Sequence, residues 1–183
     1  FTRTLRSAGA PIRVEVTLLH PDIVEDSDLD QLEAAIKEGF EAHDIVIYDG
    51  HAGQDPGYSG VSYHYKPRRA ISANDLAGLD LPDKYQVFVF NGCKTYNAYP
   101  DALYSSANKT TKNLDIISTV SFSWLSMQPW TTSGLMVELL KDTGDEHDPQ
   151  TWVEILSRIN KSNNYNVFYG VHGLDDNPRV HPY

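Results

Sequence analysis

The spacing of apolar and polar residues predicts a chain in which strands alternate with helices. Residues 12–19 (IRVEVTLL) mix alternation with an apolar end, which favours a strand after a Ser-Ala-Gly-Ala-Pro turn. Residues 29–42 repeat apolar side chains at helical spacing behind Asp28, a favourable N-cap residue, and predict a helix. Residues 45–48 (IVIY) then predict a strand that runs into Asp-Gly-His-Ala-Gly.

The rest of the chain continues this alternation. Residues 86–90 and 114–120 are nearly continuous apolar runs, which are typical of strands buried on both faces of a parallel sheet. We therefore expect one domain over residues 1–183, an α/β three-layer sandwich with a mostly parallel sheet. The other predicted elements are a hairpin around GVSYHY, a helical turn at SANDLAGL, a loop or weak helix at 94–113, a helix within 131–142, a helix capped by Asp148-Pro149 and a strand at 166–171.

Composition narrows the classes of function. The chain has 183 residues, of which 40% are hydrophobic, so it can bury a sizeable core. Its formal net charge of -10 opposes binding to nucleic acid or to anionic lipid, and no apolar run is long enough for a membrane span. Cys93 is the only cysteine, which excludes an internal disulfide and multi-cysteine zinc sites.

The first residue, Phe1, is not a methionine. We therefore expect a processed form or a part of a longer precursor, whose other domains would be partners. Abundant Tyr, Asn and Ser with little Lys favours an exported protein.

The strand at 45–48 and the strand at 86–90 both end in polar, glycine-containing segments. His51 follows the first strand and Cys93 follows the second. Catalytic groups gather at the carboxyl ends of parallel strands, so neighbouring strands would bring these two side chains together. A thiolate is the competent nucleophile and a nearby histidine is its natural partner, while glycines leave backbone N–H groups accessible as oxyanion donors.

An apolar strand ending in His-Gly, followed about forty residues later by an apolar strand ending in Cys, resembles the caspase-like clan CD cysteine peptidases. The resemblance covers residues 12–140 in element order and implies a caspase-like sheet. It implies that His51 is the acid and base, that Cys93 is the nucleophile, and that the N–H groups of Gly53 and Cys93 hold the oxyanion. It also implies a peptide or protein substrate, with no metal and no organic cofactor.

The segment IISTVSFSW after the cysteine strand looks like the one with which caspases line their substrate cleft. Residues 119–124 would then pair with an extended peptide. The resemblance marks Asn91, Thr119, Ser121 and Trp124 as substrate-binding residues.

Two positions depart from the family pattern. Ala52 separates His51 from Gly53, which leaves Ala52 as an alternative oxyanion donor. Asn91 stands two residues before Cys93, where many members carry an acid or a glutamine, so a preference for basic residues has no support. Arg68 and Arg69 follow in the next loop as candidates for binding an acidic residue, with a plain surface role as the alternative.

Other interpretations remain open from the sequence. A catalytically silent caspase-like module that binds peptides or proteins would share the same fold. A flavodoxin-like binding domain is a third interpretation, but this sequence contains no recognisable phosphate loop. His172, in the sequence VHG, is the rival partner for Cys93, and His64 is expected at the rim of the loop after His51.

Overall fold

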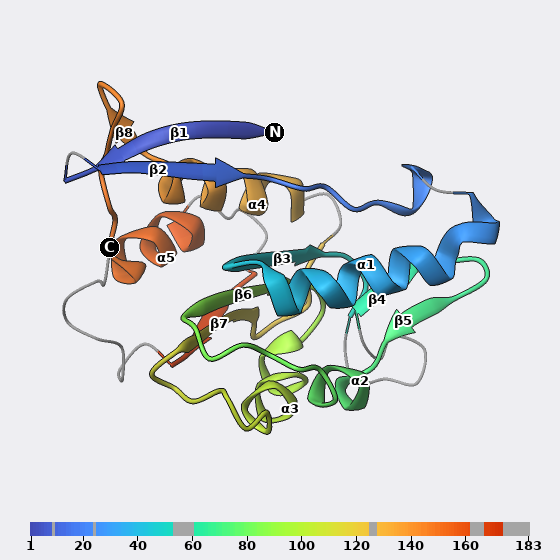
Figure 1. Ribbon diagram of the computed structural model, residues 1–183. Helices are drawn as coiled ribbons and strands as arrows, with labels where there is room; N and C mark the ends of the chain where they lie inside the picture. The colour runs from blue at the N-terminus through green and yellow to red at the C-terminus, as the bar shows by residue number, and fades with distance from the viewer. Residues whose placement is uncertain (9, 24, 53–60, 125–127, 162–166, 174–183) are drawn as a thin grey trace.

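A four-stranded sheet with the order β10-β7-β6-β3 forms the centre of the molecule (Figure 1). The computed structural model describes residues 1–183 except 9, 24, 53–60, 125–127, 162–166 and 174–183. In this sheet β3 (Ile45–Asp49), β6 (Gln86–Asn91) and β7 (Leu114–Thr119) run parallel, and β10 (Tyr169–His172) joins β7 antiparallel. Every residue of β6 and β7 is buried, as their apolar sequences predict.

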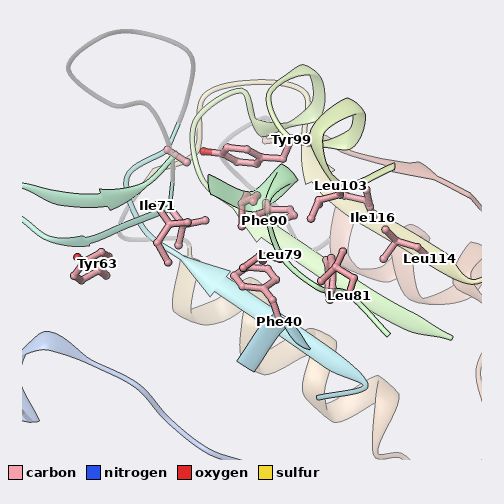
Figure 2. Packing of buried hydrophobic residues seen from close by; sticks show 14 of the residues in the cluster. Phe40, Tyr63, Ile71, Leu79, Leu81, Phe90, Tyr99, Leu103, Leu114 and Ile116 are labelled. Atoms are coloured by element: carbon pink, nitrogen blue, oxygen red, sulfur yellow. The ribbon is translucent and has the colours of Figure 1, made fainter. Parts of the chain in front are cut away.

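One face of this sheet packs against α1 (Leu29–Ala42), α2 (Ala73–Ala77) and α3 (Pro100–Tyr104). Phe40 of α1 meets Phe88 edge to face, with ring centroids 5.1 Å apart, and lies nearly parallel to Phe90 at 6.1 Å. Tyr99 closes over Phe90 with its ring centroid 4.7 Å away (Figure 2).

The opposite face packs against α4 (Gln128–Leu139) and α5 (Trp152–Lys161). Val87, Val89 and Ile117 of the strands form a second apolar cluster with Leu135 of α4 and Ile155 of α5. Alternate residues of β6 therefore enter two cores, which explains why its sequence is apolar throughout. The fold is mixed α/β.

The N-terminal region differs from the sequence prediction. The strand expected at residues 12–19 ends at Glu15 and belongs to a hairpin of β1 (Thr2–Ser7) and β2 (Ala10–Glu15). This hairpin joins a separate sheet with β8 (Asp142–Thr143) and β9 (Glu146–His147), in the order β2-β1-β9-β8. The polar alternation of TRTLRS, with Leu5 alone buried, carries little strand signal, so β1 was not predicted.

The middle of the chain follows the prediction more closely. Helix α1 spans the expected 29–42, although its N-cap Asp28 makes no side-chain capping bond. The hairpin expected around GVSYHY is β4 (Val61–His64) with β5 (Arg69–Ile71). Ser72 and Asp75 form a capping box at the start of α2. These local signals were sufficient because capping and turn chemistry act within a few residues.

The predicted cap of the last helix was wrong by a few residues. Thr151 and Glu154 bond each other's backbone N–H groups, with Thr151 N 2.9 Å from Glu154 Oε2, so Thr151 caps α5 in place of Asp148-Pro149. The helix within 131–142 begins earlier, at Gln128, and ends at Leu139. In the described residues of the last predicted strand, β10 begins at Tyr169 and is antiparallel, so the sheet is less uniformly parallel than expected.

Candidate active site

The strands that precede His51 and Cys93 are direct neighbours. β3 pairs with β6 in parallel, from Ile45 opposite Val87 to Asp49 opposite Asn91. The ladder extends one step further, where Gly50 N donates to Asn91 O at 3.2 Å. The expectation that these strands are neighbours is confirmed, and the loops that follow them leave the sheet at the same end, where both strands have their carboxyl ends.

The two loops touch just beyond the strands. A Cβ atom added to Gly92 would lie 2.6 Å from Ala52 Cβ and 2.9 Å from Gly50 O. Position 92 therefore requires glycine, since a side chain there would meet backbone. Because Ala52 follows His51 and Gly92 precedes Cys93, this contact brings the segments carrying the two candidate catalytic residues together.

The turn that carries Cys93 is tied to the segment after β7. Cys93 is half-buried, and its Sγ donates to Ser123 O at 3.5 Å. The next residue, Lys94, has a φ of 51°, and its N–H donates to Ser121 O at 2.9 Å. A left-handed conformation is uncommon for a residue other than glycine, and it persists where surrounding contacts fix the turn.

Two buried threonines, Thr95 and Thr119, hold the same turn by hydrogen bonds. Thr119 Oγ1 donates to Gly92 O and lies 2.9 Å from Thr95 Oγ1, which also bonds Phe90 O at 2.7 Å. Thr119 is fully buried, so its hydroxyl supports the turn from the end of β7. Contact between Thr119 and a substrate stays a prediction.

Asn91 lies at the centre of a polar cluster beneath Cys93. Its Oδ1 accepts from Ser123 Oγ at 3.1 Å and from Tyr169 Oη at 2.8 Å, and its side chain also hydrogen bonds Asp49. Asn91 is fully buried, so its side chain faces internal partners, and its predicted contact with a substrate stays a prediction. Burial raises the pKa of the Tyr169 hydroxyl to about 12, which keeps this group a donor at neutral pH.

Asp49 belongs to the same polar cluster, on the neighbouring strand. Its carboxylate accepts from Thr132 Oγ1 of α4 as well as from Asn91. Partial exclusion of water around the carboxylate raises the pKa of Asp49 and outweighs these two hydrogen bonds, although the residue as a whole is exposed. The alternation of the strands points Asp49 and Asn91 toward α4.

The backbone carbonyl of His51 is held by a hydrogen bond from Tyr48. This carbonyl accepts from Tyr48 Oη at 2.5 Å, and the same hydroxyl receives the N–H of Ser62 at 2.9 Å. Burial raises the pKa of Tyr48, so the phenol stays protonated. The His51 ring is half-buried and lies 6.0 Å from the Tyr65 ring between centroids. Tyr48 therefore sets where the loop after β3 leaves the sheet.

The segment after β7 shows inverted alternation. Val120, Phe122 and Trp124 are 53%, 57% and 57% exposed, whereas Ser121 is half-buried and Ser123 is buried. Thr119 N donates to Thr95 Oγ1 at 2.9 Å and Val120 N donates to Phe168 O at 2.8 Å, so at least two amides of residues 119–124 already have partners. Pairing of this segment with an extended peptide stays a prediction, as do the substrate contacts of Ser121 and Trp124.

The other predicted residues have different surroundings. His172 lies opposite Ile116 on β7, three register positions from the Tyr169–Thr119 pair and so away from the end of the sheet that carries Cys93. Its Nε2 is 3.2 Å from Tyr96 O. The geometry therefore favours His51 over His172 as the partner of Cys93. His64 Nδ1 is 2.6 Å from Pro67 O, and Arg69 forms an ion pair with Asp30 at 2.6 Å. Gly53, the expected oxyanion donor, lies outside the described residues.

The sequence analysis missed the residues that support the site. Asp49 could have been found, because it stands two residues before His51 just as Asn91 stands two before Cys93. Nothing local indicated that Tyr169, or Ser123 within the segment 119–124, would bond Asn91, since both reach it from positions far along the chain.

Comparison of the chain with family models, with curated proteins and with solved structures finds no match in any of the three. Among the helices of the described residues, none combines the length and the apolar character that crossing a membrane requires.

Proposed function

We propose that this chain is a cysteine peptidase of the caspase-like kind, built as a three-layer sandwich. The observation that carries the proposal is the contact between Gly92 and the loop of Gly50 and Ala52, at the shared edge of two parallel strands. His51 and Cys93 flank that contact.

In the proposed reaction, the Cys93 thiolate attacks the carbonyl carbon of a peptide bond. Backbone N–H groups at Cys93, and at Gly53 or Ala52, stabilise the oxyanion of the tetrahedral intermediate. His51 protonates the departing amine, which leaves a thioester on Cys93. Water, deprotonated by His51, then hydrolyses the thioester, which releases the carboxylic acid and restores the Cys93 thiolate beside a protonated His51.

Substitution of the nucleophile tests the proposal. Cys93→Ala should lower kcat for a peptide substrate by at least about a thousandfold, because the thioester can no longer form. His51→Ala should have a comparable effect, whereas the matched control His20→Ala, at an exposed histidine, should keep kcat within about twofold. Initial rates on a mixed peptide library, with circular dichroism as a check on folding, measure this. Equal cleavage by wild type and Cys93→Ala would reject the assignment.

A second candidate is a catalytically silent module that binds peptides through the same edge. One contact favours it: the Cys93 thiol donates to the backbone carbonyl of Ser123, as an unreactive thiol can. The alkylation rate with iodoacetamide separates the two candidates, since a poised thiolate reacts faster than free cysteine at neutral pH. Cys93 is the only cysteine, so the signal has one source.

A further inference from the structure

Asn91 stands where many caspase-like enzymes carry an acid, and its surroundings in this chain explain the difference. Its register partner on β3 is Asp49, so an acid at position 91 would face a second carboxylate across the ladder. The Asn91 amide can instead donate to Asp49 while its oxygen accepts the Ser123 and Tyr169 hydroxyls. Only this orientation of the amide satisfies all three partners, because a carboxylate and two donating hydroxyls need a donor and an acceptor respectively.

The Asn91 cluster reaches Cys93 through Ser123. The Ser123 hydroxyl donates to Asn91 Oδ1 at 3.1 Å, and the Ser123 carbonyl accepts from Cys93 Sγ at 3.5 Å. The side chain and the backbone of one residue therefore connect the end of β6 with the thiol. A buried amide that loses a hydrogen-bond partner destabilises the fold, because its lost hydration is no longer compensated. Breaking the Asn91–Ser123 hydrogen bond should therefore be unfavourable.

We propose that Asn91 is a positioning residue for Cys93, acting through Ser123 and aligned by Asp49. This inference rests on the proposed peptidase function and assigns Asn91 a support role in place of direct contact with the substrate. Two threonines of α4 also join the cluster: the Thr132 hydroxyl donates to Asp49, and Thr131 Oγ1 lies 3.1 Å from Tyr169 Oη.

Two single variants test the connection. Ser123→Ala removes the hydroxyl but leaves the carbonyl, and should lower kcat about tenfold with KM within about twofold, because a loosened thiol reaches the attack geometry less often. Alkylation of Cys93 in this variant should become about threefold faster at neutral pH, since the Ser123 carbonyl is no longer held in place by the hydroxyl and accepts the thiol proton less well. Ser133→Ala, which removes an exposed hydroxyl that donates to Trp130 O of its own helix, is the matched control and should change neither value.

Asn91→Asp adds a test that depends on pH. At about pH 5 the new carboxyl is protonated and can donate to Asp49 as the amide does. The ratio of the variant's kcat to that of wild type should then be close to one. At about pH 9 the ionised carboxylates at positions 49 and 91 repel each other, and this kcat ratio should fall about tenfold. A purely structural role would lower the free energy of unfolding at high pH but leave the kcat of the folded protein unchanged relative to wild type.

The double variant Asp49→Asn with Asn91→Asp serves as the rescue. The amide at position 49 donates to the carboxylate at position 91, which accepts the Ser123 and Tyr169 hydroxyls, so every hydrogen bond of the cluster is restored. Its kcat ratio should stay level between about pH 5 and pH 9.

The results separate the failure of the two proposals. A wild type that cleaves no peptide overturns the proposed function, while the alkylation rates still test the positioning role. Unchanged alkylation and kcat in Ser123→Ala, or a double variant no better than Asn91→Asp alone, would overturn the inference.

Discussion

At the scale of single residues, the candidate site depends on how closely two backbones approach. Gly92 has no room for a Cβ atom, because Ala52 and Gly50 O lie within 3 Å of where it would be built. This requirement comes from packing and not from a turn, so nothing in the local sequence distinguishes Gly92 from an ordinary loop glycine.

Gly92→Ala should therefore destabilise the protein by about 1–3 kcal/mol, because overpacking forces the two loops apart. Chemical denaturation measures the free energy of unfolding. Gly39→Ala is the matched control, since nothing lies within 4 Å of its added Cβ and it sits inside α1; it should stabilise by about 0.5–1 kcal/mol. A Gly92→Ala protein as stable as wild type would show that the loops are not in contact.

At the scale of elements, capping decides where helices begin. Thr151 and Glu154 form reciprocal bonds at the start of α5, whereas Asp148 pairs with Lys141 at 3.1 Å on the surface. The sequence prediction chose Asp148-Pro149 because Asp and Pro are common at helix starts. The amphipathic face of α5 begins at Trp152, which makes Thr151 the residue in the capping position.

Thr151→Ala should cost about 1 kcal/mol of stability, as loss of an N-cap does. Asp148→Ala should cost less, about 0–1 kcal/mol, because it loses only an exposed ion pair. Thermal unfolding followed by circular dichroism compares the two. If Asp148→Ala proved the more damaging, the cap would lie where the sequence alone predicted it.

At the scale of the whole molecule, one buried cation affects the dependence of stability on pH. Lys109 is 3% exposed, and its Nζ donates to Lys84 O at 2.7 Å. Burial is the main cause that lowers the pKa of Lys109 to about 8, with the nearby charge of Lys84 adding to it. Between about pH 8 and pH 10.5 the folded protein binds fewer protons at this group than the unfolded chain, so this group makes stability rise with pH there.

Lys109→Met should therefore stabilise the protein near pH 7, and the gain should disappear toward about pH 10.5. Lys112→Met, at an exposed lysine, is the control and should show no such dependence. Denaturation midpoints across this pH range measure the difference. A constant effect of Lys109→Met at every pH would contradict the lowered pKa.

The sequence predicted those elements whose signal is local. Helix 29–42, the strands at 45–48, 86–90 and 114–120, and the capped turn at Ser72 all have their apolar spacing or capping residues within a few positions. β1, β8 and β9 escaped prediction because they are short or polar and exist through pairing with one another.

By itself, the sequence determined that His51 and Cys93 each follow an apolar strand, because apolar runs and glycines can be read directly along the chain. Only the tertiary structure decided that these strands are neighbours, that Ala52 meets Gly92, and that Asn91 turns inward to Asp49, Ser123 and Tyr169. The physical reason is that pairing and side-chain hydrogen bonds join residues far apart in the chain, and local spacing carries no information about such partners.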